Sequence, residues 1–229
     1  MKKIIIKSIL LSLLATNSMA MGSGFYAGVG VGVQDVFSEL SLTDYDENGV
    51  DVARMEQGNT GFMGSLSLGY NFLFNQQVML GLQFDGQISG VKTEHQATTT
   101  FLEEYNQSSI TTKSKHGFGV NVRPGMLFND NASGFLILGY RYIKVNHDFY
   151  ESGTDIPLLN FAQNQNNHGF EYGLGTEISL TEQFGLRLEV TQTQFQTNTI
   201  FSLANVAELT SKTKLNQALL SIIWYPECY

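Results

Sequence analysis

The 229-residue sequence contains one cysteine, three prolines and no long apolar segment beyond its first twenty residues. Cys228 has no partner within the chain, so intrachain disulfides do not hold the fold. No later segment approaches the ~18 consecutive apolar residues of a transmembrane helix. Pro-rich linkers, charge blocks and low-complexity tracts are also missing, and we therefore expect a single folded domain.

The N-terminus has the features of an export signal. A basic start is followed by a short apolar run over residues 4–14 and by the small residues Ser18 and Ala20. The run is shorter than the ~20 residues that a membrane-spanning helix needs. We expect residues 1–20 to be a secretory signal peptide cleaved after Ala20, and residues 21–229 to form the mature domain.

The mature chain is acidic. Once the three lysines of the signal peptide are removed, ten basic residues stand against 21 acidic ones. Nucleic-acid binding requires basic patches that neutralise phosphates, so no nucleic-acid partner is expected.

Apolar residues alternate with polar or small ones in eight segments, which is the period of a β-strand with two different faces. Phe135 and Ile137 interrupt the pattern in the fifth segment, and Leu219 and Ile223 interrupt it in the eighth. The predicted strands cover residues 24–35, 61–72, 78–88, 117–128, 135–142, 170–180, 184–191 and 216–226.

The connections alternate between short and long. Short, turn-like connections occur at 74–77, 129–133 and 181–183, whereas long, polar and irregular ones are expected at about 36–59, 93–113, 147–168 and 197–213. This order predicts an all-β, eight-stranded, antiparallel up-and-down sheet with both chain ends on the side of the short turns. Closing the sheet into a barrel removes its two exposed edges.

Charged residues fall in the middle of the glycine-rich face, which favours a membrane barrel with that face inside. Three arginines and four carboxylates can neutralise one another in a narrow lumen. The alternative is a soluble lipid-carrying barrel, in which this face would be solvated outside. The expected lumen charge network consists of Asp85, Arg123, Arg141, Glu171, Glu177, Arg187 and Glu189.

Glycines occupy every second position in the first strand, at Gly28, Gly30 and Gly32, with valines between them. An eight-stranded barrel is barely wide enough inside for side chains. We therefore expect these glycines to leave room in the lumen for arginine and glutamate side chains, while the valines contact lipid.

Aromatic residues gather at the short-turn ends of the apolar face. Such a ring is typical of the membrane–water interface, where aromatic side chains are enriched. The predicted periplasmic girdle consists of Phe25, Phe72, Phe128, Phe184 and Trp224.

Stretches distributed over nearly the whole mature chain resemble the small outer-membrane barrels of Gram-negative bacteria, the OmpA-like and opacity-protein-like group. They are 24-GFYAGVGVGVQ-34, 66-LSLGYNF-72, 137-ILGYRY-142, 169-GFEYGLGTEISLT-181, 185-GLRLEV-190 and the last strand. The resemblance implies a transmembrane β-barrel over residues 21–229, with long extracellular loops and short periplasmic turns. It also implies an outer-membrane location, with lipid, lipopolysaccharide and the barrel-insertion machinery as partners. Members of the group usually end on an aromatic residue of the last strand, whereas Pro226 stands there in this chain, close to Trp224 and Tyr229.

Two motifs suggest metal chemistry only weakly. The segment 44-DYDENG-49 resembles the first half of a calcium loop, but Met55 takes the place of the glutamate ligand. His116, His147 and His168 lie beside the long connections, and a shared metal or hydrolytic site at one rim is the alternative to separate, solvated histidines. No metal and no cofactor is expected.

Ser114 and His116 are two residues apart, which on a regular strand places both on one face. No residue is expected to orient the histidine, so no catalytic residue is assigned. The sequence predicts a non-enzymatic barrel with a plugged polar lumen, whose loops contact host surfaces, other cells or lipopolysaccharide and which helps to stabilise the membrane. A narrow channel for small solutes and a lipid A-modifying enzyme are the alternatives.

Overall fold

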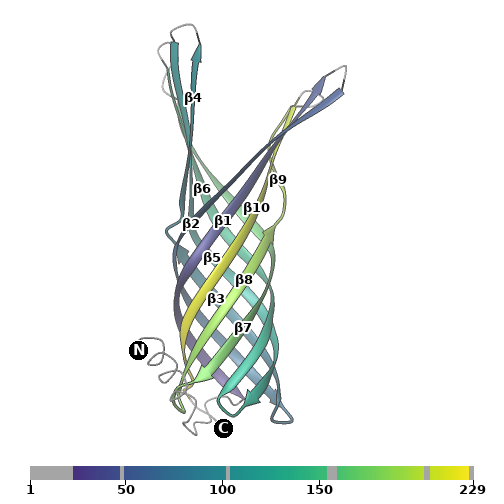
Figure 1. Ribbon diagram of the computed structural model, residues 1–229, viewed down its shortest axis with the longest axis vertical. Coiled ribbons are helices and arrows are strands. Elements are labelled where there is room, and N and C mark those ends of the chain that lie inside the picture. Colours follow the sequence, from purple (N-terminus) through teal and green to yellow (C-terminus); the bar gives the residue numbers. More distant parts are fainter. Residues whose placement is uncertain (1–22, 47–48, 102–103, 154–158, 204–206, 227–229) are drawn as a thin grey trace, which may run out of the picture.

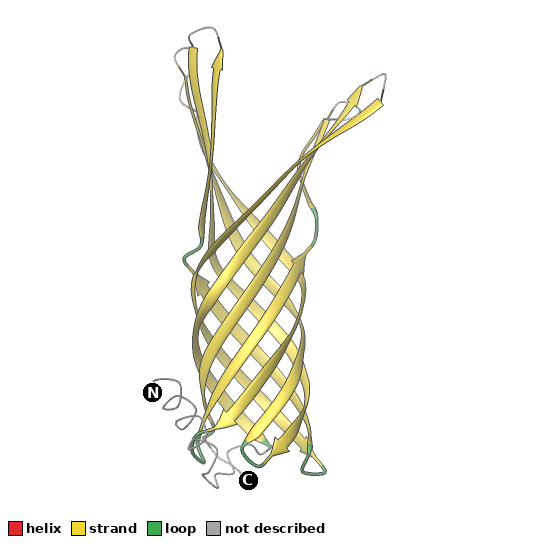
Figure 2. Ribbon diagram, in the orientation of Figure 1, coloured by secondary structure: helices red, strands yellow, loops and turns green. Residues whose placement is uncertain are grey.

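The computed structural model describes residues 23–46, 49–101, 104–153, 159–203 and 207–226, which form a tall barrel of strands (Figures 1 and 2). Within this part of the chain, no helix has the length and apolar character needed to cross a membrane. The strands are β1 (Gly24–Asp46), β2 (Gly49–Phe74), β3 (Val78–Ser89), β4 (Lys92–Phe101), β5 (Glu104–Asn129), β6 (Ala132–Gly153), β7 (Leu159–Ser179), β8 (Phe184–Phe195), β9 (Asn198–Leu203) and β10 (Ala207–Trp224).

The ten strand segments build eight barrel strands. β3 and β4 both pair with β5 and follow each other along it, and β8 and β9 do the same along β10. Each remaining strand pairs antiparallel with its neighbours in chain order, and β1 pairs with both β2 and β10. The sheet is therefore closed, and the predicted eight-stranded, antiparallel, up-and-down barrel is confirmed.

Both ends of the described chain lie at the end of the barrel that carries the short connections (Figure 1). In the turn that joins β2 to β3, Asn75 and Gln76 adopt positive φ angles of 52° and 59°. Asparagine tolerates this left-handed conformation better than most residues do, which suits Asn75 to the turn.

The long connections differ from the expectation of irregular structure. At the opposite end of the barrel the strands continue as paired ribbons, and the wall divides into two extensions that diverge (Figure 2). One extension contains β2, β1, β10 and β9, and the other contains β4, β5, β6 and β7. The sequences of these strands are predominantly polar and were interpreted as loops, yet strand pairing still satisfies their backbone groups.

The outside of the barrel wall is apolar and the inside is polar, the reverse of a water-soluble protein. Phe62 is 82% exposed, Leu66 68% and Ile88 70%. Such a continuous apolar surface is suited to lipid acyl chains.

The residues that interrupt the alternation point into the lumen. Phe135, Ile137 and Ile223 are all buried. Phe135 and Ile137 pack with Met79, and Ile223 packs with Tyr26 and Tyr225. Both clusters lie toward the short-turn end, where aliphatic and aromatic side chains fill the lumen.

Candidate functional site

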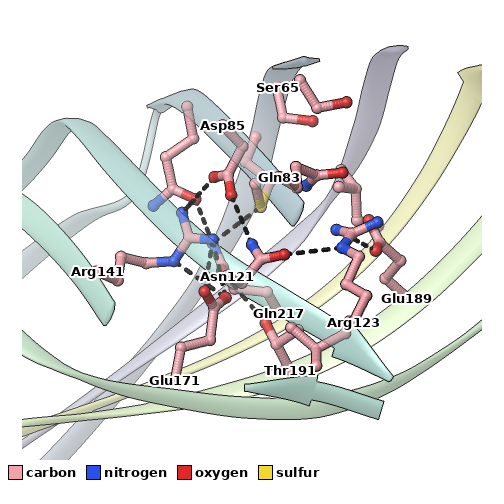
Figure 3. A pocket seen from close by; sticks show the side chains of 15 residues that line it. Ser65, Gln83, Asp85, Asn121, Arg123, Arg141, Glu171, Glu189, Thr191 and Gln217 are labelled. Carbon is pink, nitrogen blue, oxygen red and sulfur yellow. Dashed lines mark hydrogen bonds and ion pairs between the residues drawn. The ribbon is translucent and has the colours of Figure 1, made fainter. Parts of the chain in front are cut away.

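The structure places all seven charged residues of the expected network inside the lumen, where their exposed fractions are between 1% and 6%. Figure 3 shows five of them converging from several strands with polar neighbours between them. A charged group in such a narrow, enclosed space is costly unless it is paired and hydrogen-bonded. The pairing of the three arginines therefore decides how the lumen is held together.

Arg141, on β6, joins two carboxylates. Its Nε and Nη2 atoms donate to Glu171 Oε1 over 3.0 and 2.8 Å, and Nη2 also reaches Glu171 Oε2 at 3.0 Å. Its Nη1 atom donates to Asp85 Oδ2 at 2.8 Å and to Gln87 Oε1 at 2.9 Å. Because these partners stand on β3 and β7, Arg141 links strands on both sides of β6.

Arg123, on β5, is less completely paired. Its Nε atom donates to Asn121 Oδ1 at 2.8 Å. Its Nη2 atom lies 2.6 Å from Glu189 Oε1, an ion-pair contact without the alignment of a hydrogen bond. The buried Nη1 atom has no hydrogen-bond partner among the described residues, although the guanidinium carbon lies 5.2 Å from the centre of the Phe135 ring.

Arg187, on β8, forms a third group nearer the short turns. Its Nε atom donates to Glu177 Oε2 at 2.7 Å, and its guanidinium carbon lies 4.5 Å from the centre of the Tyr26 ring. The Tyr225 hydroxyl donates to Glu177 Oε1 at 2.6 Å. The Tyr26 hydroxyl and Arg187 Nη1 both donate to Gln83 Oε1, at 2.9 and 3.0 Å. The sequence pattern did not identify the two tyrosines, because aromatic residues were assigned to the lipid face.

Buried amides connect the charged groups, and sequence reasoning did not single them out. Asn121 donates to Asp85 Oδ1 at 3.1 Å and accepts from Arg123, so it joins two of the three groups. Gln217 Nε2 donates to Gln87 Oε1 at 2.7 Å and to Gln34 Oε1 at 3.3 Å. The sequence signal that could have identified these amides is their position on the same face of each strand as the glycines and charged residues.

The glycines of β1 do not make room for arginine, contrary to the expectation. A Cβ atom at Gly28 would lie 2.5 Å from Ser67 Oγ, and one at Gly30 would lie 2.3 Å from Ser221 Oγ. These small residues let the neighbouring strands pack closely. The arginine space is supplied on β5 instead, since a Cβ atom at Gly119 would meet Asp85 Oδ1 at 2.8 Å and Arg141 Nη2 at 2.9 Å.

Apolar layers lie on both sides of the charged groups. Toward the short turns the layer contains Phe135 and its partners, and toward the other end a separate layer is formed by Ile143, Val145, Phe195 and Leu215. Between them, a cavity of about 30 Å³ remains among the polar side chains. That volume holds one or two water molecules, so the middle of the lumen is filled with protein.

The five residues of the expected girdle all stand outside the barrel, near the short turns or chain ends, and are 40–70% exposed. Phe25 packs edge-on against Tyr70, with ring centroids 4.7 Å apart, and Tyr70 lies 4.6 Å from Phe72. Tyr70 therefore belongs to the aromatic girdle, although the sequence pattern did not include it.

The histidines do not form a common site. His116 on β5 and His168 on β7 are separated by β6, and their rings lie beside Phe118 and Tyr140 at centroid distances of 6.1 and 6.0 Å. The side chains of His147 and of the 44–49 segment lie outside the described residues. Among the described side chains, no group of three or more potential metal ligands is found.

The strand is not regular between Ser114 and His116, contrary to the expectation from their spacing. Ser114 stands opposite Val145 and His116 opposite Lys144, because Lys115 forms a β-bulge between them. Consecutive residues of β6 point to opposite faces, so the bulge places the two register positions on opposite sides of the wall.

The chain belongs to the outer membrane protein beta-barrel domain family, whose sequence profile matches residues 8–217. Membership places the protein in the outer membrane of a Gram-negative type of envelope. The signal peptide and its cleavage after Ala20 stay a prediction, since residues 1–22 lie outside the described part of the chain.

Solved structures with a similar fold include Ail, the attachment invasion locus protein of Yersinia pestis, at 13% identity and a TM-score of 0.34, covering 86% of this chain and 99% of that one. The outer membrane protein OprG of Pseudomonas aeruginosa has 13% identity and a TM-score of 0.48, with coverage of 91% and 100%. The outer membrane protease OmpT of Escherichia coli has 8% identity and a TM-score of 0.47, with coverage of 92% and 99%. A comparison with curated protein sequences gives no match. These values are too low to transfer an activity.

The unequal pairing of the arginines predicts unequal effects of their removal. Arg141→Ala leaves Glu171 and Asp85 buried without their cation, and we expect a loss of about 3–5 kcal/mol in the free energy of unfolding. Arg123→Ala leaves the Glu189 carboxylate without its cation but also removes the Nη1 donor that had no partner. We therefore expect a smaller loss of about 1–2 kcal/mol in the free energy of unfolding. Urea unfolding in detergent micelles, followed by fluorescence of the single tryptophan, Trp224, measures both. Equal losses, or a larger loss for Arg123→Ala, would contradict this assignment.

The surroundings of two glycines predict that alanine substitutions at these positions will affect stability differently. Gly119→Ala forces a methyl group into the Asp85–Arg141 contact, and overpacking of this kind costs about 1–3 kcal/mol. Gly86→Ala on β3 is the matched control, because its Cβ atom would meet nothing closer than Phe118 at 3.8 Å on the outer face. The same unfolding measurement should show a lower midpoint for Gly119→Ala alone. A parallel loss in Gly86→Ala would mean that the effect arises from the strand rather than from the lumen.

Proposed function

We propose that this protein is a non-enzymatic outer-membrane barrel with a closed lumen, which presents its two strand extensions at the cell surface to contact host surfaces, other cells or lipopolysaccharide. The observation that carries the proposal is the filling of the lumen. The barrel serves as an anchor in the membrane, and the extensions serve as the contact surface.

The lumen contents argue for an anchor and against a pore. A channel for small solutes needs a continuous aqueous path, whereas this lumen is crossed by contacts between non-adjacent strands, such as Arg123 with Glu189 and Arg187 with Gln83, and has an apolar layer on either side of them. Moving a solute through would require breaking the Arg141 contacts with both carboxylates. Such a network has a structural role, since it fixes several strands to one another.

The extensions support surface contact because of their size and placement. Pairing between β5 and β6 continues as far as Asn106 with Gly153, well beyond the Phe118–Tyr142 pair at the outer end of the apolar wall. Residues of β2 from Gly49 to Phe62 pair with β1 but not with β3. The upper ribbons therefore leave backbone edges available to a partner, a common mode of recognition for extended peptides.

A lipid A-modifying enzyme has no support from the described side chains. The Ser114–His116 pair is divided by the bulge at Lys115, and no carboxylate is observed to orient His116. The non-enzymatic function is therefore the better proposal. Overexpression of the protein should then leave the mass of lipid A unchanged.

Conductance separates the anchor from the channel. The purified protein should give no discrete current steps in planar bilayers, because the charged network and both apolar layers block the lumen. Phe195→Ala, which thins the outer apolar layer, should also give none, since the Arg141 contacts remain. Discrete current steps in the wild type that become larger in Phe195→Ala would contradict the anchor function and favour a narrow channel.

Shortening one extension tests the contact surface. Residues 94–111 can be replaced by an Asn-Gly turn joining β4 to β5, because Thr93 pairs with Thr112 at that level. We expect the shortened barrel to keep its change of gel mobility on boiling, which shows a folded barrel, and to lose at least half of its adhesion to host cells. A second variant replaces 41–54 in the same way between Leu40 and Met55, which also pair, and so shortens the other extension. Full adhesion in both variants would contradict a role for the extensions.

A further inference from the structure

A polar hollow lies on the outer surface of the barrel, where β8, β10 and β1 are adjacent. Its volume is about 300 Å³. It differs from the rest of the outer wall, which is apolar over the barrel strands. The lining consists of Phe37, Ser38, Glu39, Gln192, Lys212, Lys214 and Asn216.

The strand register places this hollow just beyond the apolar wall. On β10 the outward-facing residues run from Trp224 through Leu220 to Ala218, and the next outward positions are Asn216 and then Lys214. Lys214 is thus the eleventh residue counted from the girdle at Trp224, and a transmembrane β-strand takes about 9–11 residues. The hollow therefore stands at the level of the outer-leaflet headgroups.

Cations are divided by type between the two sides of the wall. Arg123, Arg141 and Arg187 are buried in the lumen, whereas Lys212 and Lys214 are exposed on β10 just beyond the apolar wall. Lysine suits a headgroup position, since its aliphatic stem can lie along apolar surface while its ammonium reaches the polar layer. An otherwise acidic chain thus presents two adjacent cations where lipid phosphates lie.

The other side of the hollow offers groups that bind sugars. Gln192 Nε2 donates to Asn216 Oδ1 at 2.7 Å, and Gln192 accepts a hydrogen bond from the Tyr172 hydroxyl. Gln194 Nε2 donates to the same hydroxyl at 2.9 Å. These amides are held in place by one another on an outward face, and they keep further donors and acceptors for hydroxyl groups. The half-exposed Phe37 ring adds an apolar surface beside them.

We propose that this hollow binds the phosphorylated sugar headgroup of an outer-leaflet glycolipid. Lys212 and Lys214 bind the phosphate through charge-assisted hydrogen bonds, and Gln192 and Asn216 contact the sugar hydroxyls. Glu39, which pairs with Lys212 in the β1–β10 register, reduces the positive charge and so weakens phosphate binding. A lipid is the occupant because the hollow lies on outward positions of β8, β10 and β1, directly beyond the apolar wall and at the base of one extension.

The test measures binding of lipid A, with and without its phosphates, to the folded protein in detergent micelles. The wild type should bind the phosphorylated form more tightly. Lys212→Gln/Lys214→Gln should raise its Kd about tenfold, from about 1.4 kcal/mol of lost charge interaction, and leave the dephosphorylated form unchanged. Glu39→Gln should lower the Kd for the phosphorylated form.

Lys115→Gln/Lys144→Gln is the matched control, since it removes two lysines just beyond the apolar wall on β5 and β6, which are not among the strands that line the hollow. It should change the Kd less than about twofold. A mobility change on boiling confirms that each variant is folded. Equal losses in both double variants would overturn the site in favour of general charge attraction. Displacement of lipid A by millimolar inorganic phosphate, or equal binding of both lipid forms, would also overturn it. Conductance plays no part in these readouts, so they stand apart from the closed-lumen proposal.

Discussion

The bilayer imposes the constraint from which the rest of the structure follows: lipid offers no hydrogen-bond partners to a backbone. Every strand that crosses the membrane must therefore pair on both sides, and the pairing of β1 with β10 meets this requirement by closing the sheet. Closure then fixes the inside–outside division of side chains, because each strand alternates between lipid and lumen. The exposed apolar wall and the buried charges are two consequences of the same closure.

A narrow lumen turns the remaining charges into cross-links. Desolvation makes an unpaired Arg141 or Glu171 costly, so each charge requires its partner at contact distance, and the partners come from different strands. The network therefore couples strand register to charge pairing: a slip of one residue between β6 and β7 would point Glu171 at lipid. This coupling explains why a protein with few charged residues, 15% of its sequence, places seven of them in one interior.

The period of the sequence predicted the barrel and the inward position of its charges, because alternation and short turns are local signals. It did not predict which residues meet, since contacts such as Arg141 with Asp85 depend on the stagger between strands. Apolar inward residues such as Ile143 were missed because composition alone assigns them to lipid. The extensions were missed for a different reason: their sequences are predominantly polar, and such segments were interpreted as loops. The bulge at Lys115, which reverses the facing of every residue beyond it, has no signature in the local sequence.

The different properties of arginine and lysine explain why the two kinds of cation lie on opposite faces of the barrel wall. Arginine holds several acceptors in a fixed plane and is weakly hydrated, which suits it to a dry lumen where Glu171 and Asp85 must be bound together. Lysine is a compact, strongly hydrated charge on a flexible stem, which suits it to the wet layer where Lys212 and Lys214 lie. Exchange of the two types would leave lysines in the lumen with too few directed donors for their carboxylates. The inner arginines thus fill the lumen, whereas the outer lysines stand where the proposed site binds a lipid phosphate.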